Sequence, residues 1–311
     1  TVVDLTRALA GPHTGMMLAD LGARVIKVEA VGTGDETRSW GPPFVEGSDG
    51  EDVATYFLSC NRNKESVALD LKSDDGREVL TALVRRADVL MENFRPGTLD
   101  RLGFGPQRLA ELNPRLVLLS ISGFGHDGPE GSRAGYDQIA QGEAGLMSLT
   151  GSGPDDPQRV GVPIGDLLSG MYGAYGVLAA LLERERTGRG QVVRTSLLAS
   201  IVGVHAFQGT RWTVAGEVPR AQGNHHPSIA PYGLFRCGTG SVQVACGNES
   251  LWRRLCAEFG LDPDAELMAT NAERVAHREL VIRTLEGAFA PHTGEEVLAR
   301  LATAGVPAGQ V

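Results

Sequence analysis

The chain has 311 residues and a mass of 32.9 kDa, which is long for one domain, so two domains are expected. Apolar residues make up 42% and charged residues 22% of the chain, and these ordinary globular values exclude bulk disorder. The formal net charge of -9 argues against a nucleic-acid partner, so any anionic ligand must be held by a local basic pocket.

The first part of the chain alternates between two hydrophobic periods. Short β-branched runs predict strands at residues 2–5, 24–29, 66–69, 88–91, 116–120 and 191–195. Helical patterns between them cover residues 14–21, 74–86, 107–112 and 166–186. This alternation predicts an α/β fold with a parallel sheet and helices on both faces.

A second, smaller α/β unit is predicted further along. A helix over residues 196–213 leaves the first domain, and residues 216–230 are rich in turn formers and typical of a linker. Strands at 232–236 and 241–245 and helices at 249–259, 272–288 and 294–304 follow. The expected organisation is a large domain over residues 1–195, a linker helix and loop over 196–230, and a small domain over 231–311.

The cysteines, the first residues and the most apolar stretch indicate the cellular compartment. The four cysteines show no C-x-x-C spacing, which disfavours a zinc knuckle or disulfide framework and favours a reducing, cytoplasmic setting. The opening T-V-V-D-L-T-R lacks a signal-peptide pattern. The most membrane-like stretch, residues 164–182, contains Asp166 and several glycines, so we expect a buried core helix there and no membrane partner.

Three common catalytic patterns fail. Gly11 and Gly15 after the first strand are spaced G-x-x-x-G, whereas dinucleotide binding needs G-x-G-x-x-G, so a nicotinamide or flavin role is disfavoured. Ser122 and Ser152 both lack the first glycine of the G-x-S-x-G pattern of serine hydrolases. The seven histidines form no H-E-x-x-H pair, and no metal site is expected.

The strongest local signal surrounds Asp166, in G-V-P-I-G-D-L-L-S-G, where the long apolar helix begins. One interpretation is an N-cap, since an aspartate there satisfies orphan N–H groups. The other is a covalent nucleophile, with Gly165 and Gly170 leaving space for a bulky ligand. A nucleophilic carboxylate must be ionised, and even a pKa raised by ~2 units would leave most of it charged at neutral pH.

Basic residues mark the first-domain loops. Arg38, Lys72, Arg95 and Arg101 follow or lie near predicted strand ends, where ligands bind in open α/β sheets. A guanidinium suits phosphate because its planar fork binds bidentately. For any one of them ordinary surface charge is the favoured interpretation, whereas the four together are equally compatible with a polyphosphate site. Phe94 is interpreted as flanking an adenine or as a core residue.

At these residues the chain is similar to a known family. The matching stretches include L-T-R-A-L-A-G-P, L-A-D-L-G-A-R-V-I-K-V-E, G-D-E-T-R, N-R-N-K-E-S-V-A-L-D-L-K, A-D-V-L-M-E-N-F-R-P-G, G-Y-D-Q-I-A-Q, V-G-V-P-I-G-D and L-L-E-R-E-R-T-G-R-G-Q. They follow one another between residues 2 and 196, with thinner matches beyond, such as G-N-H-H-P-S-I-A-P-Y-G. The chain thus resembles the class III CoA-transferases, the group that contains formyl-CoA:oxalate and carnitine CoA-transferases.

The resemblance implies a Rossmann-like large domain, a smaller α/β domain and an interlocked homodimer. It also implies that members usually continue past this point, so a C-terminal return segment to the large domain is expected to be absent. Asp166 matches the family's nucleophile. Coenzyme A would enter as a substrate, with no permanently bound cofactor. The CoA site that the resemblance implies is lined by Leu9, Ala10, Arg38, Leu69, Asp70, Leu71, Lys72, Asn93, Phe94, Arg95, Arg101, Ala134, Gly135, Tyr136 and Asp137.

The activity that the resemblance implies is transfer of coenzyme A from an acyl-CoA to a free carboxylic acid through aspartyl anhydride and aspartyl-CoA intermediates. Oxyanion donors are expected from Gly142, Gly145 or the Gly223 region. The G-N-H-H-P-S-I-A-P-Y-G segment looks like that of members acting on small dicarboxylates, so succinyl-CoA is a possible donor. His225, His226 or Arg220 could then pair with a distal carboxylate; the alternative for this segment is a turn-rich linker.

Two alternatives stay open. The related α-methylacyl-CoA racemases add a histidine in a G-H-D context, where this chain reads Gly135-Tyr136-Asp137. Tyrosine is a poor base at neutral pH, which favours transfer. Leu9 departs from the glutamine of oxalate-type members, which disfavours formyl-CoA:oxalate exchange. The other alternative is a CoA-binding protein without turnover.

Overall fold

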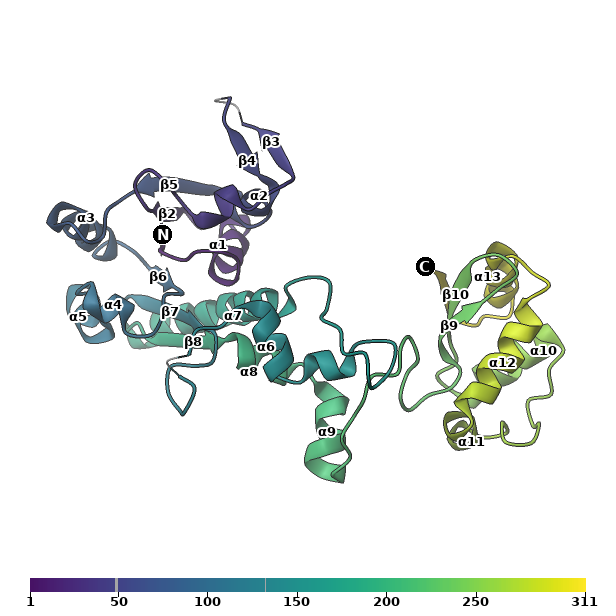
Figure 1. Cartoon of the computed structure of the whole chain (residues 1–311). Helices are drawn as coiled ribbons and strands as arrows, with labels where there is room; N and C mark the ends of the chain where they lie inside the picture. The colour runs from purple at the N-terminus through teal and green to yellow at the C-terminus, as the bar shows by residue number, and fades with distance from the viewer. Residues whose placement is uncertain (48–49, 132) are drawn as a thin grey trace. The chain divides into compact units, whose positions relative to one another are not determined.

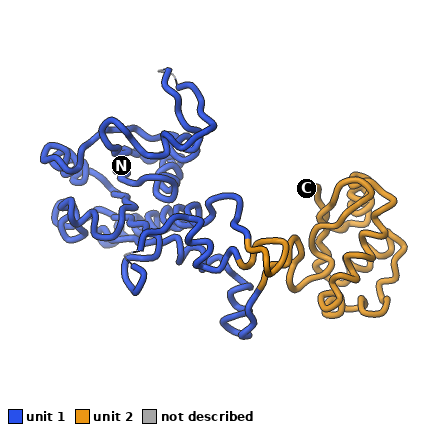
Figure 2. Tube along the Cα trace, viewed as in Figure 1, with its two compact units in different colours: residues 1–147, 158–219 blue, residues 148–157, 220–311 orange. Residues whose placement is uncertain are grey.

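The computed structural model describes residues 1–47, 50–131 and 133–311 (Figure 1). The chain divides into two compact units (Figure 2). Unit 1 comprises residues 1–147 and 158–219, and unit 2 comprises residues 148–157 and 220–311. The short segment 148–157 therefore groups with the second unit although it precedes the longest helix of the first.

Unit 1 contains a sheet of six parallel strands within the described residues. The order across the sheet is β5-β2-β1-β6-β7-β8, which is the 3-2-1-4-5-6 order of doubly wound folds. The strands are β1 Val2–Asp4, β2 Val25–Glu29, β5 Lys64–Ala68, β6 Val89–Glu92, β7 Val117–Ser122 and β8 Val192–Ser196. The predicted parallel α/β sheet is confirmed, with strand ends that shift by one or two residues.

Helices cover both faces of this sheet because successive strand residues point in opposite directions. Val89 and Met91 of β6 belong to the core cluster that includes residues of α1 and α7. Leu90 belongs to the cluster that includes Leu80 of α3 and Leu109 of α5. The helices of unit 1 are α1 Ala10–Asp20, α2 Thr55–Asn61, α3 Asp74–Val84, α4 Thr98–Arg101, α5 Pro106–Leu112, α6 Asp137–Glu143, α7 Ile164–Thr187, α8 Leu197–Gly203 and α9 Ala206–Ala215.

Several elements differ from the sequence prediction. The single helix predicted over residues 196–213 is two helices, α8 and α9, and Ala206, the first residue of α9, has φ 47°. Leu197 and Ile201 of α8 are buried in the same core as α1 and α7. The 3₁₀ turns Glu36–Ser39 and Leu146–Leu149, the hairpin β3 Phe44–Glu46 and β4 Asp52–Ala54, and helices α2, α4 and α6 were not predicted.

Helix α7 has the length and hydropathy that a membrane span would need, a test that core helices of soluble proteins also pass. It is buried on one face only. Small residues such as Gly170 and Gly173 lie against α1 and β7, while Tyr175 and Leu182 on another face are 75% and 77% exposed. The prediction of a core helix is confirmed for the first face and wrong for the second.

Unit 2 is a small α/β unit with an antiparallel sheet in the order β11-β10-β9. Its elements are β9 Tyr232–Arg236, β10 Ser241–Ala245, α10 Glu249–Phe259, α11 Asn271–Ala276, α12 Arg278–Phe289, α13 Gly294–Thr303 and β11 Ala308–Gln310. Phe235, Trp252 and Phe289 lie in its core. The prediction of a single helix over residues 272–288 is wrong, because the helix is interrupted at His277, between α11 and α12.

The strand order fixes where a ligand can bind in unit 1. Strands β1 and β6 lie side by side at the centre of the sheet, and the chain winds outward from them in opposite directions. The loops after their carboxyl ends therefore diverge and leave a crevice, the usual ligand site of such sheets.

Candidate active site

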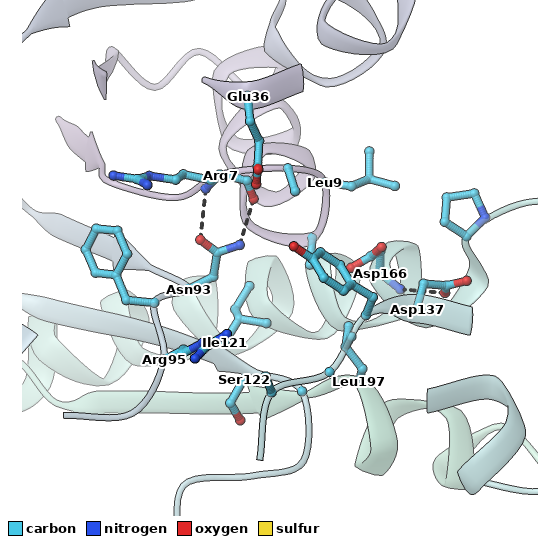
Figure 3. Close-up of a pocket in the computed structure, with 18 of the residues that line it drawn as sticks. Arg7, Leu9, Glu36, Asn93, Arg95, Ile121, Ser122, Asp137, Asp166 and Leu197 are labelled. Atoms are coloured by element: carbon cyan, nitrogen blue, oxygen red, sulfur yellow. Dashed lines mark hydrogen bonds between the residues drawn. The ribbon is translucent and has the colours of Figure 1, made fainter. Parts of the chain in front are cut away.

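A cavity of about 520 Å³ occupies this crevice. Loops after four neighbouring strands line it: residues 7–10 after β1, 93–96 after β6, 122–123 at the end of β7 and Leu197 after β8. Residues 133–137 and the first turn of α7, with Asp166, line it from the other side. Figure 3 shows Arg7, Asn93 and Arg95 toward one end of the cavity and Asp137 and Asp166 toward the other.

The arginine end is held together by one asparagine. The Asn93 side chain accepts a hydrogen bond from the Arg7 backbone N–H at 2.8 Å and donates one to the Arg7 carbonyl at 2.7 Å. The Arg7 guanidinium lies 5.5 Å from the ring centre of Phe94. Within the described part of the chain neither Arg7 nor Arg95 forms an ion pair, and both are exposed. Two free guanidiniums beside an aromatic ring suit a phosphorylated, aromatic ligand group.

The aspartate end depends on Asp137. Asp166 is the third residue of α7, and Pro163 at the N-cap position has no side-chain hydrogen bond to the helix. The Asp137 carboxylate instead accepts the Gly165 N–H at 2.7 Å and the Asp166 N–H at 3.3 Å. A buried side chain of α6 thus caps α7, so the N-cap interpretation of Asp166 is wrong and its carboxyl is left for another role.

Burial raises the pKa of Asp166, and the negative charge of Asp137 raises it further, to about 7. Among the described residues none donates a hydrogen bond to this carboxyl that would offset these effects. About half of the carboxyls are therefore ionised at pH 7. The rise from 3.8 to about 7 is larger than the ~2 units considered from the sequence, because the nearby Asp137 carboxylate was not foreseen.

The two glycines beside Asp166 serve helix packing. A Cβ at Gly165 would lie 2.8 Å from Ile201 Cδ1 of α8 and 3.0 Å from Asp137 Oδ1. A Cβ at Gly170 would lie 2.6 Å from the Ala10 carbonyl oxygen of α1. The backbone oxygen at Gly170 cannot move aside, and at Gly165 a Cβ would press on both Ile201 and the carboxylate that caps α7, so neither position has open space beside it. The interpretation of these glycines as ligand space was wrong: they allow α7 to approach its neighbours closely.

Aromatic residues that the sequence analysis did not single out also line the cavity. Tyr56 of α2 stacks edge-on against Trp40, with ring centres 5.0 Å apart. Burial, followed by the nearby Asp166 carboxylate, raises the pKa of Tyr56 to about 12, so its hydroxyl keeps its proton at neutral pH. Without predicted elements between residues 30 and 63, no sequence signal placed these rings near Asp166.

The structure brings together some of the site residues that the family resemblance implies and leaves the others apart. Ten of its residues come together around the cavity: Leu9, Ala10, Asn93, Phe94, Arg95, Ala134, Gly135, Tyr136, Asp137 and Asp166. Arg38, Leu69, Asp70, Leu71, Lys72 and Arg101 lie outside its lining.

Arg38 is occupied elsewhere. It binds Glu29 through two hydrogen bonds of 2.7 and 2.8 Å and lies 3.8 Å above the Phe57 ring. Burial alone would raise the pKa of Glu29, but the bonds from Arg38 and from Ser66 lower it to about 2. Arg101 donates to Thr98 Oγ1 at 2.7 Å. Of the four basic residues proposed for a polyphosphate, only Arg95 lines this cavity.

The expected oxyanion donors do not line the cavity either. Gly142 and Gly145 lie outside it, and Gly223 belongs to unit 2. The glycines that do line it are Gly123 and Gly135. Across the described residues no cluster of His, Cys, Asp and Glu side chains could hold a metal ion.

Unit 2 has a cavity of its own, of about 510 Å³, lined by His225, His226 and Tyr232 among others. Burial, followed by the charge of Arg278, lowers the pKa of both histidines. Both shifts disfavour the cationic form of these histidines in unit 2 taken by itself. Pairing of His225, His226 or Arg220 with a distal carboxylate stays a prediction.

Comparison with known proteins decides the family. The sequence profile of CoA-transferase family III matches residues 1–311. The chain belongs to CoA-transferase family III. It is 42% identical to the succinate–glutarate CoA-transferase of Agrobacterium fabrum, over 100% of this chain and 78% of that protein. It is 39% identical to the acetyl-CoA:oxalate CoA-transferase of Acetobacter aceti, over 99% of this chain and 78% of that protein.

A solved structure shares the fold of the family III chain. The CAIB/BAIF family protein of Brucella suis superposes with a TM-score of 0.89 at 43% identity, covering 100% of this chain and 82% of that one. The resemblance found in the sequence is thereby confirmed, and with it a CoA-transferase as the class of enzyme.

Proposed function

We propose that this protein transfers coenzyme A from a small acyl-CoA to a free carboxylic acid, with Asp166 as the covalent nucleophile. The observation that carries this proposal is a partly buried carboxyl to which none of the described residues donates a hydrogen bond, at one end of a cavity whose other end holds two guanidiniums that form no ion pair with the described residues. An elongated substrate with an anionic nucleotide and a reactive thioester has that distribution of charge.

Each step of the cycle exchanges one bond for another. Asp166 attacks the thioester carbonyl, the C–S bond breaks, and a mixed anhydride and CoA thiolate result. The thiolate then attacks the Asp166 carbonyl and releases the donor acid, which leaves an aspartyl-CoA thioester. The acceptor carboxylate attacks this thioester, the C–S bond breaks and the CoA thiolate leaves, which gives a second anhydride. The thiolate then attacks the acceptor carbonyl of that anhydride, and the new acyl-CoA leaves Asp166. Asp166 is regenerated as a carboxylate and no net proton is taken up.

The surroundings of Asp166 fit these steps. Burial strengthens its carboxylate as a nucleophile, because fewer waters must be removed before attack, and also keeps water from the anhydrides. Tyr56, whose hydroxyl keeps its proton, Gly123 and Gly135 line the cavity, and we propose the Tyr56 O–H and backbone N–H groups of these glycines as donors. They would stabilise the oxyanions of the tetrahedral steps.

We propose succinyl-CoA or another small acyl-CoA as donor and a small dicarboxylic acid as acceptor. The relatives named above use succinate, glutarate, acetyl-CoA and oxalate. A succinyl-CoA:mesaconate CoA-transferase of Haloarcula hispanica is 41% identical over the whole of this chain and 78% of that protein. All the acids in these names are small.

Two arms of one experiment separate the alternatives. The protein is incubated with succinyl-CoA and labelled glutarate, mesaconate or oxalate, and labelled acyl-CoA is measured over time. Formation of labelled thioester in many turnovers supports transfer, while binding of CoA without turnover would show a CoA-binding protein. A racemase would instead wash deuterium from solvent into the α-carbon of a 2-methylacyl-CoA.

Tyr136, at the place of the racemase histidine, is 66% exposed, which does not suit a positioned base.

We further propose a homodimer. The exposed face of α7 carries Met171, Tyr175, Leu178 and Leu182, which are 50%, 75%, 45% and 77% exposed. Their i, i+4, i+7, i+11 spacing makes one apolar stripe along a helix, the pattern of a helix–helix interface. A second copy is the occupant that the family resemblance implies. Analytical ultracentrifugation of Tyr175→Glu/Leu182→Glu should give a monomer, and an unchanged dimer or a monomeric wild type would contradict this.

A further inference from the structure

A buried carboxyl lies directly behind the arginine end of the cavity. Glu92 is the last residue of β6, and its partner in the sheet register is Ser120 of β7. Both side chains are only 6% exposed, and Glu92 does not line the 520 Å³ cavity. Glu92 immediately precedes Asn93, Phe94 and Arg95, which do line it.

Two hydrogen bonds connect Glu92 to its neighbours, and a third extends the chain from Ser120 to His126. Ser120 Oγ bonds to Glu92 Oε1, and His126 Nε2 lies 2.6 Å from the same Ser120 oxygen. The other carboxyl oxygen, Oε2, accepts the Phe94 backbone N–H at 2.9 Å. A chain of side chains from β7 and the loop after it therefore ends on the backbone of the segment that lines the cavity.

Burial of the Glu92 carboxyl costs free energy of folding. Burial, followed in part by the charge of Asp100, raises the pKa of Glu92, and no cation of the described residues forms an ion pair with it. A buried carboxyl without a cation costs free energy that only its hydrogen bonds offset. Glu92 fixes Phe94, and Asn93 fixes Arg7, so one buried acid controls the backbone of both loops at the arginine end.

We propose that Glu92, held by Ser120 and His126, is a positioning residue that fixes residues 93–95 for the nucleotide part of the acyl-CoA. This inference rests on the proposed function only for the identity of the ligand. Asp166 lies at the other end of the cavity, so Glu92 acts on binding and not on the chemical step.

The donor and acceptor roles along this chain of hydrogen bonds can be reversed, so a glutamine at position 92 can keep the chain intact. An ionised Glu92 accepts from both Ser120 and Phe94. A glutamine can accept from Phe94 with its carbonyl and donate to Ser120 with its amide, and Ser120 can then donate to His126 Nε2. Glu92→Gln should therefore keep the segment in place, whereas Glu92→Ala leaves Phe94 N–H and Ser120 without the acid.

The test compares Glu92→Ala, Glu92→Gln and Ser120→Ala with a matched structural control, Asn113→Ala. Asn113 donates to the carbonyls of Val84 and Ala87 at the opposite end of the strands, so its loss lowers stability without touching the cavity. For each variant we would measure thermal stability, amide hydrogen exchange of residues 93–97, the Kd of CoA by calorimetry, and kcat and KM for acyl-CoA.

We expect Glu92→Ala to raise amide exchange at residues 93–97 and to raise the Kd and KM about tenfold at unchanged kcat. Glu92→Gln should stay near wild type, and Asn113→Ala should lose stability alone. The proposal is overturned if Glu92→Ala changes neither the exchange of this segment nor the Kd, or if Asn113→Ala does so equally. A wild type that binds no CoA would refute the proposed function, while the exchange data would still decide whether Glu92 positions the segment.

Discussion

The two ends of the cavity differ in how they treat charge. At one end Arg7 and Arg95 are exposed and unpaired within the described residues, on loops tied together by Asn93. At the other end Asp166 is held near a second carboxylate, Asp137, and burial raises its pKa to about 7. Under the proposed function, the exposed cations bind the ligand, while the acid with the raised pKa reacts with it.

The sharpest way to break this comparison is to remove the reactive acid. Asp166→Asn should reduce CoA transfer by a factor of about 10⁴ or more, because an amide cannot form the anhydride. Binding of CoA, which depends on the other end, should persist in calorimetry. The exposed Asp75 provides a matched control, and Asp75→Asn should remain fully active. Measurable multiple turnover by Asp166→Asn would disprove its role.

The cationic end can be tested by two arginines that are close in sequence. Arg95 lines the cavity and Arg101 does not. Arg95→Ala should raise the KM for acyl-CoA about tenfold at nearly constant kcat, since a uniform binding contact is lost. Arg101→Ala should change the KM less than twofold in the same steady-state assay. Equal effects of the two substitutions would show that the site extends to the residues that only the family resemblance implied.

The coupling of the two aspartates predicts a pH dependence. Transfer needs ionised Asp166, so its rate should rise with pH through a midpoint near 7. In Asp137→Asn the amide oxygen can still accept the Gly165 N–H, but the negative charge is gone. The midpoint should move to lower pH without reaching the ordinary value of 3.8, because burial remains. A rate–pH profile measured from pH 5 to 9 for both proteins checks this, and an unmoved midpoint would contradict the coupling.

The smallest expected effect is on stability. The folded pKa of Asp166 lies above its unfolded value, so the wild type loses stability as pH rises from about 4 to 7. Asp166→Asn does not titrate and should be more stable than wild type at pH 8, by roughly 1–3 kcal/mol after allowance for solvent screening. The difference should nearly vanish at pH 4. Urea unfolding at the two pH values measures it; a variant less stable at pH 8 would mean that the carboxylate supports the fold.

The fold was largely predictable because its signals are local. Strands such as V-I-K-V-E and V-L-L-S-I-S are apolar runs buried on both faces, and such a run can be recognised without knowledge of its neighbours in the sheet. The interruption between α8 and α9 was harder to predict from the sequence. α8 and α9 share one helical pattern, and only the packing of Leu197 and Ile201 in the core of unit 1 separates them.

The site was predictable in part. Asp166 could be singled out by its position, but its environment depends on Asp137, which is far away in sequence and reaches α7 through tertiary structure. Arg38 shows the opposite case: the sequence analysis grouped it with the residues of a polyphosphate site, yet its guanidinium is paired with Glu29 of β2. Pairings of this kind depend on which strand ends are neighbours, and composition or spacing does not reveal that.

The covalent role of Asp166 is tested most directly by trapping. The protein is incubated with acyl-CoA alone, treated with hydroxylamine or borohydride, digested and mapped by mass spectrometry. We predict a hydroxamate or a reduced side chain at Asp166, and no modification in Asp166→Asn. A modification at any other residue, or none at all under conditions of steady turnover, would contradict the account.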